Sequence, residues 1–142
     1  MTDFLQVRIA RRKEEVEGII TLELVDPLGD PLPAFEAGAH VEVQVAPGLS
    51  RHYSLCGSPD DLQRYCLGIL REPASRGGST RIHEQFQEGA LVSISRPRNQ
   101  FRLEEGAGHS LLVGGGIGIT PILAMAWRLQ ALGASFELHY CV

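Results

Sequence analysis

The feature that most constrains the fold of this chain is a series of short segments in which apolar and polar residues alternate, with turn residues roughly every ten positions. Alternation with a period of two is typical of half-buried β-strands, because successive side chains point to opposite faces of a sheet. The first segment shows it in Leu5, Val7 and Ile9, and Pro47-Gly48 forms one of the intervening turns. A long series of short strands at this spacing predicts a closed or nearly closed antiparallel barrel.

One helix interrupts the predicted strands. Between Gly78 and Gly89 the period changes, because Ile82 and Phe86 stand four positions apart and so share one face of a short helix that begins near Ser79. We expect this helix to plug one end of the barrel. The strands are expected at residues 4–26, as two strands with a break at 14–15, and at 41–45, 51–56, 64–71 and 91–96, with a short extended piece to residue 101.

The C-terminal part has a different pattern, which is typical of a βαβ unit in a parallel sheet. A continuous apolar strand at 111–113 is followed by a glycine cluster, a helix from Pro121 to Leu132 and another strand at 136–142. Thr120 is the expected N-cap of this helix, with Pro in the first helical position, and Gly133 is its expected stop.

These two patterns predict two domains of unequal completeness. A βαβ unit cannot bury both faces of its sheet alone. The Gly-rich, polar stretch at 104–109 is the best candidate for a linker. We therefore expect a mainly β chain, with a complete barrel at residues 1–105 and an incomplete α/β domain at 106–142.

Composition excludes several classes of function. At 142 residues, 44% hydrophobic and 21% charged, the chain resembles an ordinary soluble globular protein. A net charge of -4 argues against nucleic-acid binding. The longest apolar stretch, near 117–127, is too short and Gly-rich to span a bilayer, and the N-terminus lacks the pattern of a signal peptide, so a cytoplasmic protein is expected. Cys56, Cys66 and Cys141 have no ligand spacing, so no metal or iron–sulfur site is predicted.

Two glycine-rich turns are candidates for anion binding. The glycines before Pro121 would let a ligand approach the helix N-terminus, although the dinucleotide fingerprint G-x-G-x-x-G does not fit there. In the second turn the amides of Gly78 and Ser79 could point at an anion, with charge added by Arg71 and Arg76. Taken singly, each turn is more often only a loop.

The stretch Arg51-His52-Tyr53-Ser54 places a fixed positive charge, an aromatic ring and a hydroxyl within four residues. Its simpler interpretation is a strand with a surface arginine, a packed tyrosine and a hydroxyl bonded to the backbone. Strict alternation puts Arg51 and Tyr53 on one face and Ser54 on the other. For all three to touch one ligand, the ligand must wrap around the strand end, or a bulge must turn the strand.

Four motifs in order carry a resemblance to a known family. They are R-x-Y-S-L at 51–55, R-x-P-x-x-R-G-G-S at 71–79, P-R-N-x-F at 97–101 and G-G-G-I-G-I-T-P at 114–121. The chain resembles the ferredoxin-reductase superfamily, and within it the phthalate dioxygenase reductase and vanillate O-demethylase reductase group. The resemblance implies a six-stranded antiparallel Greek-key barrel that binds flavin, with one capping helix, followed by the start of a pyridine-nucleotide domain. FMN, rather than FAD, is usual in this group.

The resemblance also implies roles for single residues. Arg51 would neutralise the FMN phosphate, and Tyr53 would lie against the flavin and its ribityl chain. Ser54 would hydrogen-bond near flavin N5, and Thr120 would face both flavin and nicotinamide, which makes these two the implied catalytic residues. The whole implied cofactor-binding set is Arg51, His52, Tyr53, Ser54, Leu67, Gly68, Ile69, Arg71, Gly77, Gly78, Ser79, Gly115, Gly116, Thr120 and Pro121.

Within that set the remaining members fall into three groups. Residues 67–69 would line the ring through their backbone, and Gly68 has no side chain to obstruct it. Residues 77–79 would close over the phosphate, with Arg71 as a further candidate. Gly115, Gly116 and Pro121 would form the approach of the nicotinamide nucleotide. No general acid or base is needed, so the five histidines are expected to be structural or solvent-facing.

The function implied is an NAD(P)H-dependent flavin oxidoreductase that passes electrons through FMN to an iron–sulfur centre serving an aromatic-ring oxygenase or demethylase. The 2Fe–2S domain that many members carry is absent from this sequence. The residue that separates NADH from NADPH would lie about 20 positions beyond the glycine turn, where this sequence stops. Two alternatives stay open: a flavin-binding module without reductase activity of its own, and a barrel that binds no flavin.

Overall fold

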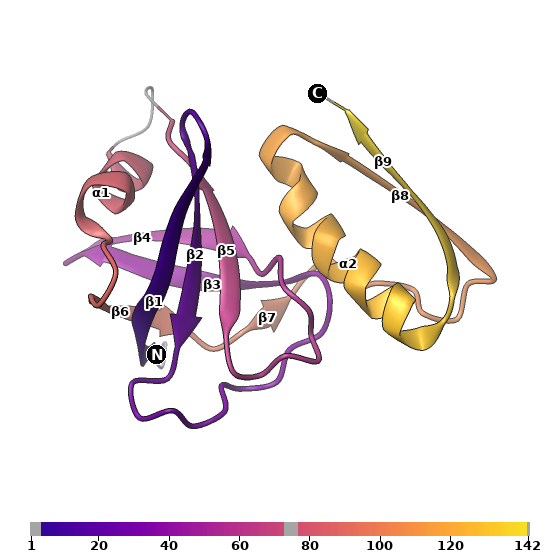
Figure 1. The fold of residues 1–142 in the computed structure, drawn as a ribbon, viewed down its shortest axis with the longest axis horizontal. Helices are drawn as coiled ribbons and strands as arrows, with labels where there is room; N and C mark the ends of the chain where they lie inside the picture. The colour runs from indigo at the N-terminus through magenta and orange to yellow at the C-terminus, as the bar shows by residue number, and fades with distance from the viewer. Residues whose placement is uncertain (1–3, 73–76, 142) are drawn as a thin grey trace.

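The computed structural model describes residues 4–72 and 77–141, and it places a β-barrel beside a smaller strand–helix–strand unit (Figure 1). The elements of the barrel are β1 (Phe4–Val16), β2 (Ile19–Val25), β3 (Ala39–Ala46), β4 (Leu49–Ser54), β5 (Tyr65–Leu70), α1 (Gly78–Gln85), β6 (Leu91–Ser95) and β7 (Arg98–Asn99). The elements of the second unit are β8 (His109–Gly115), the 3-10 turn η1 (Gly116–Gly118), α2 (Ile119–Leu132) and β9 (Ser135–Cys141).

The barrel strands form one antiparallel sheet whose neighbours follow the order β4-β3-β6-β1-β2-β5, with β7 beside β3. Strands that are distant in sequence therefore lie side by side, as in a Greek key. The two edge strands meet at a single bridge between Leu55 and Leu67, which closes the sheet. We call the line where β4 and β5 face each other the seam.

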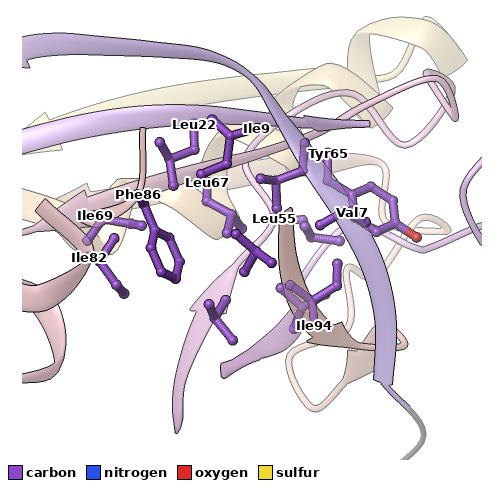
Figure 2. Packing of buried hydrophobic residues seen from close by; sticks show 14 of the residues in the cluster. Val7, Ile9, Leu22, Leu55, Tyr65, Leu67, Ile69, Ile82, Phe86 and Ile94 are labelled. Atoms are coloured by element: carbon purple, nitrogen blue, oxygen red, sulfur yellow. The ribbon is translucent and has the colours of Figure 1, made fainter. Parts of the chain in front are cut away.

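The barrel interior holds the main core of the chain. Inward-facing side chains from strands across the sheet pack together, and Figure 2 shows the contact of β1, β2, β5 and β6 residues in it. Val7, Leu22 and Ile94 are at most 1% exposed. Burying an aliphatic side chain completely stabilises the fold by roughly 1.5–3 kcal/mol relative to leaving it exposed, so the alternating pattern has a direct energetic basis.

Helix α1 plugs one end of the barrel, as expected. Ile82 is 0% exposed and packs in the barrel core together with Phe86. Two side-chain contacts fix the C-terminal part of the helix: Arg12 Nη1 and Nη2 donate to the carbonyls of Phe86 (2.8 Å) and His83 (2.7 Å). His83 Nε2 also contacts the carbonyl of Ile69 at 2.9 Å. The helix is therefore attached to both β1 and β5.

The second unit is a parallel pair of strands, β8 and β9, with α2 packed on one face. Leu112, Ile122, Met125 and Leu129 form its small core, which Ala37 of the barrel joins. The opposite face of the pair carries exposed apolar side chains, among them Leu111 (61%) and Val113 (56%). None of the helices in the described residues has the length and apolar character needed to cross a membrane.

The predicted fold class is confirmed, and several element boundaries differ from the prediction; for example, the strand predicted at 111–113 is β8, His109–Gly115. The β1–β2 turn lies at Glu17-Gly18, beyond the predicted break, because strand pairing continues through Lys13 opposite Thr21. Strand β4 ends at Ser54, where its pairing with β3 ends. The predicted N-cap is wrong: α2 starts at Ile119 directly after η1, and the Thr120 hydroxyl donates back to the carbonyl of Ile117 (3.2 Å). The division into domains at 105/106 stays a prediction.

Candidate functional site

A pocket of about 370 Å³ opens along the seam, between the edge of β4, the edge of β5 and the N-terminus of α2. Its volume falls in the range of small-molecule sites, roughly 300–1,000 Å³. It is lined by residues from four separate parts of the chain: Arg51, His52, Tyr53, Ser54, Gly68, Leu70, Glu72, Ser79, Ile117, Gly118, Thr120 and Pro121.

The β5 wall presents backbone to this pocket. The Cys56 N–H donates to the carbonyl of Cys66 across the seam (3.0 Å), whereas the Arg71 N–H donates to Gly18 on the β2 side (2.7 Å). Peptide groups of alternate residues in a strand point the same way. The N–H and C=O groups of Gly68 and Leu70 therefore share the direction of Cys66 and face the seam. A flat polar ligand lying there would meet hydrogen-bonding groups of the main chain.

Arg51, Tyr53 and Ser54 all line this pocket, although strand alternation puts Ser54 on the other face of β4. Arg51 and Tyr53 stand opposite the buried Val43 and Val41 on β3, so their side chains lie on the core side of the sheet, and that of Ser54 lies on the other. The register of β3 and β4 is unbroken over this stretch. The pocket follows the free edge of β4 and is lined from both faces there, so no bulge is involved.

A positively charged end of the pocket lies where Arg51 meets the N-terminus of α1. A Cβ added to Gly78 would lie 2.7 Å from Arg51 Nε, so only glycine allows the guanidinium this close to the helix. Ser79 is 6% exposed, and its hydroxyl accepts a hydrogen bond from the Glu72 N–H (2.9 Å). A guanidinium beside a helix N-terminus favours an anionic group. Arg76, a predicted contributor of charge, lies outside the described residues.

The opposite end of the pocket is formed where the second unit touches the barrel. A Cβ added to Gly68 would lie 3.0 Å from Thr120 Cγ2 and 3.6 Å from Ile117 Cδ1. The absence of a side chain at Gly68 therefore lets α2 approach β5. Ser54 and Thr120 line the pocket from different elements, β4 and α2. Burial raises the pKa of the Tyr53 phenol above its ordinary value of 10.0, so the phenol stays protonated near neutral pH.

Seven predicted residues of the set do not line this pocket. The side chains of Leu67 and Ile69 are buried in the barrel core. Gly77 and Gly78 form the start of α1 behind Arg51. The others lie apart from the pocket: Arg71, whose Nη2 lies 3.6 Å from Glu84 Oε1, and Gly115 and Gly116, which join β8 to η1.

Sequence reasoning missed four residues that line the pocket: Leu70, Glu72, Ile117 and Gly118. A signal for Leu70 was present, because in a strand it shares the backbone direction of Gly68. No comparable signal marks Glu72, which follows the end of β5. Ile117 and Gly118 belong to a 3-10 turn that the glycine cluster alone does not reveal.

Outside this pocket, one histidine has two side-chain partners. His109 contacts Ser135 Oγ (2.7 Å) and Glu137 Oε2 (3.0 Å). Burial raises the pKa of the Cys56 thiol to about 12, so this cysteine is a poor nucleophile at neutral pH. Within residues 4–72 and 77–141 there is no group of three or more His, Cys, Asp or Glu side chains that could hold a metal ion.

The chain combines an antiparallel barrel, a helix that plugs one end of it and a βαβ unit that shares the seam pocket with the barrel. This combination defines the class of ferredoxin-reductase-like folds. Comparison with known proteins agrees. The chain is 52% identical over 137 residues to vanillate O-demethylase oxidoreductase from a Pseudomonas species, and 45% identical over 138 residues to phthalate dioxygenase reductase from Burkholderia cepacia. Each match covers 96% of this chain and 43% of the relative. No family model matches the chain.

The fold comparison gives the same result. The solved structure of phthalate dioxygenase reductase, described as modular and as transferring electrons from pyridine nucleotides to a 2Fe–2S centre, matches with a TM-score of 0.93 at 45% identity. The match covers 96% of this chain and 43% of that one. The chain belongs to the ferredoxin-reductase superfamily, in the group of phthalate dioxygenase reductase and vanillate O-demethylase reductase. It spans less than half the length of these relatives.

Proposed function

We propose that this chain is the flavin-binding part, with the first part of the nucleotide-binding domain, of an NAD(P)H-dependent oxidoreductase. The flavin would be FMN, and the electrons would pass to an iron–sulfur centre serving an aromatic-ring oxygenase or demethylase. The observation that carries the proposal is the seam pocket, which combines backbone hydrogen-bonding groups, an arginine at a helix N-terminus and the Thr120 wall.

The residues present fit a flavin mononucleotide. The seam-facing peptide groups of Gly68 and Leu70 suit the polar edge of a flat ring. Arg51 beside the start of α1 suits one phosphate group. The choice of FMN over FAD rests on the resemblance of the four sequence motifs to a group in which FMN is usual.

When bound, the flavin supplies the redox chemistry, since it accepts a hydride from the nicotinamide and can release the electrons singly. The chain's own residues bind and orient. Ser54 would donate a hydrogen bond near flavin N5 from the β4 side. Thr120 and Pro121 would form the wall against which the nicotinamide stacks, and the close contact at Gly68 would help to keep water out.

The phosphate assignment is tested by comparing two ligands. Arg51→Ala should weaken FMN binding about 10- to 150-fold, because a charge-assisted contact is worth roughly 1.5–3 kcal/mol. Riboflavin has no phosphate, so its dissociation constant should hardly change. Titration by quenching of flavin fluorescence measures both. Arg102→Ala, at an exposed arginine outside the pocket, is the matched control. Equal losses for FMN and riboflavin would refute the assignment.

The second candidate function is a flavin-binding module without reductase activity of its own; the chain covers 43% of the relatives that it matches. Anaerobic addition of NADH or NADPH to the FMN-loaded chain separates the two: bleaching of the visible flavin absorbance supports the oxidoreductase. A yellow protein that stays oxidised supports the module. A chain that takes up neither FMN nor FAD contradicts both.

A further inference from the structure

A second pocket, of about 450 Å³, lies where the segment after the barrel meets α2 and the loop between β4 and β5. Its charged lining consists of four carboxylates and two guanidinium groups: Glu36, Asp60, Glu104, Glu105, Arg102 and Arg128. None of these residues lines the seam pocket.

Arg128 of α2 joins three parts of the chain at this junction. Its Nε donates to Glu105 Oε2 (2.8 Å) and its Nη2 to Glu105 Oε1 (3.4 Å), which is a two-point contact with the segment after the barrel. Its Nη1 lies 3.8 Å from Asp60 Oδ1, in the loop that connects β4 to β5. The hydrogen bond from Arg128 lowers the pKa of the Glu105 carboxyl. One side chain thus links α2 to the loop between the two strands that line the seam.

Helix geometry relates Arg128 to the seam pocket. Arg128 follows Pro121 by seven positions, which is about two helical turns, so the two residues lie on the same side of α2. Near its N-terminus α2 contacts the barrel where Thr120 meets Gly68. Further along, the helix contacts the barrel through Arg128 and Asp60, with the apolar contact of Ala37 in the same region. A rigid helix held at both ends resists tilting, whereas one held at a single end does not.

We propose that Arg128 is a positioning residue whose ion pairs with Glu105 and Asp60 hold α2 at the tilt that keeps Thr120 packed against Gly68. The guanidinium touches no part of the seam pocket and acts through the helix. Its effect on flavin reduction rests on the proposed function, but its effect on the packing of α2 does not. The two consequences can therefore be measured separately.

The first measurement needs no cofactor. Amide hydrogen exchange is compared between the wild-type chain and Arg128→Glu, which places a third carboxylate beside Asp60 and Glu105. Exchange should accelerate about fivefold at residues 117–120 and 68–70, in line with the size of exposed ion-pair networks, and stay unchanged in β1. Arg102→Glu makes the same charge change in the same pocket, but its partner is Glu36 (3.1 Å), so α2 should be unaffected. Unchanged exchange at residues 117–120, or equal acceleration throughout the chain, overturns the proposal.

The second measurement uses the FMN-loaded chain at saturating NADH or NADPH. Arg128→Glu should lower the rate of flavin reduction about fivefold while the FMN dissociation constant stays the same, and adding Asp60→Arg should restore most of the rate by re-forming a pair. A parallel loss of FMN affinity, or no recovery in the double variant, overturns the proposal. If the wild-type chain takes up no FMN or is not reduced, the proposed function fails, and the exchange result alone decides the role of Arg128.

Discussion

The barrel and the βαβ unit differ in how completely their apolar side chains are buried. In the barrel, the inward residues Leu22 and Ile69 are 1% and 0% exposed, because the sheet closes on itself. In the β8–β9 pair, α2 covers one face, and Leu111 and Val113 remain 61% and 56% exposed on the other. The seam pocket therefore lies between the barrel, which has a complete core of its own, and the βαβ unit, which supplies one wall. Ligand binding and reactivity should then be separable by mutation.

Core truncation should show the largest difference between the two parts. Leu22→Ala should lower the free energy of unfolding by about 2–5 kcal/mol, because it leaves a cavity in the closed core. Leu112→Ala, in the small cluster under α2, should cost about 2 kcal/mol or less, since its surroundings can collapse. Urea titration followed by circular dichroism and by the fluorescence of Trp127, the single tryptophan, measures both. Equal costs would mean that the two parts share one cooperative core.

The contact between the parts is tested at Gly68. The Cβ of Gly68→Ala would lie 3.0 Å from Thr120 Cγ2, which forces α2 away from β5 at a cost of about 1–3 kcal/mol. The rate of flavin reduction should fall at least tenfold or so, because the nicotinamide wall shifts. Stopped-flow absorbance of the FMN-loaded protein measures that rate.

A second substitution sharpens this test. Thr120→Ser removes the methyl group that the new Cβ would meet and keeps the hydroxyl. The double variant Gly68→Ala/Thr120→Ser should therefore recover part of the lost rate, whereas Gly68→Ala with the unrelated Thr21→Ser should not. A double variant as slow as Gly68→Ala alone would place the defect in the flavin site and not at the contact.

A smaller effect is expected at the helix that belongs to the barrel alone. Arg12→Ala removes the hydrogen bonds to the carbonyls of Phe86 and His83, which should lower stability by about 1–2 kcal/mol and loosen α1. FMN affinity should fall because Arg51 rests against the start of α1, while exchange in α2 should stay unchanged. Arg11→Ala, at the exposed neighbour, is the control. Faster exchange in α2 would show that the parts are coupled through α1.

Most of the fold could be predicted because alternation and helical spacing are local properties of the sequence. The register that brings Arg51 beside Gly78, and the approach of Thr120 to Gly68, depend on contacts between residues far apart in the chain. Local patterns carry no such information. The prediction of the N-cap of α2 was wrong for a related reason. Thr120 is a good capping residue, but η1 runs directly into the helix, so Thr120 lies inside the first turn. The roles of the pocket residues stay predictions.

The smallest expected effect is a difference between the two parts in how their stability depends on pH. Burial, then the charges of His52 and Arg98, lower the pKa of His40 in the barrel below its ordinary value of 6.5, against a weaker opposing effect of Glu42. As the pH falls through 6.5, the unfolded chain binds this proton before the folded chain does, so stability decreases, and the loss levels off below the folded pKa. His40→Gln should flatten the slope of stability against pH in that interval, as measured by urea titration at a series of pH values.

The junction should respond only in stronger acid. The pKa of Glu105 lies below its ordinary value of 4.5 because of the hydrogen bond from Arg128, so the pair contributes its stability above 4.5 and loses it as the pH falls through the folded pKa. Mild acid should therefore weaken the barrel while α2 stays in place. If exchange in α2 instead accelerates near pH 6 or so, the two parts do not respond to acid independently. Protonation in the barrel would then alter the packing of the second unit across the seam.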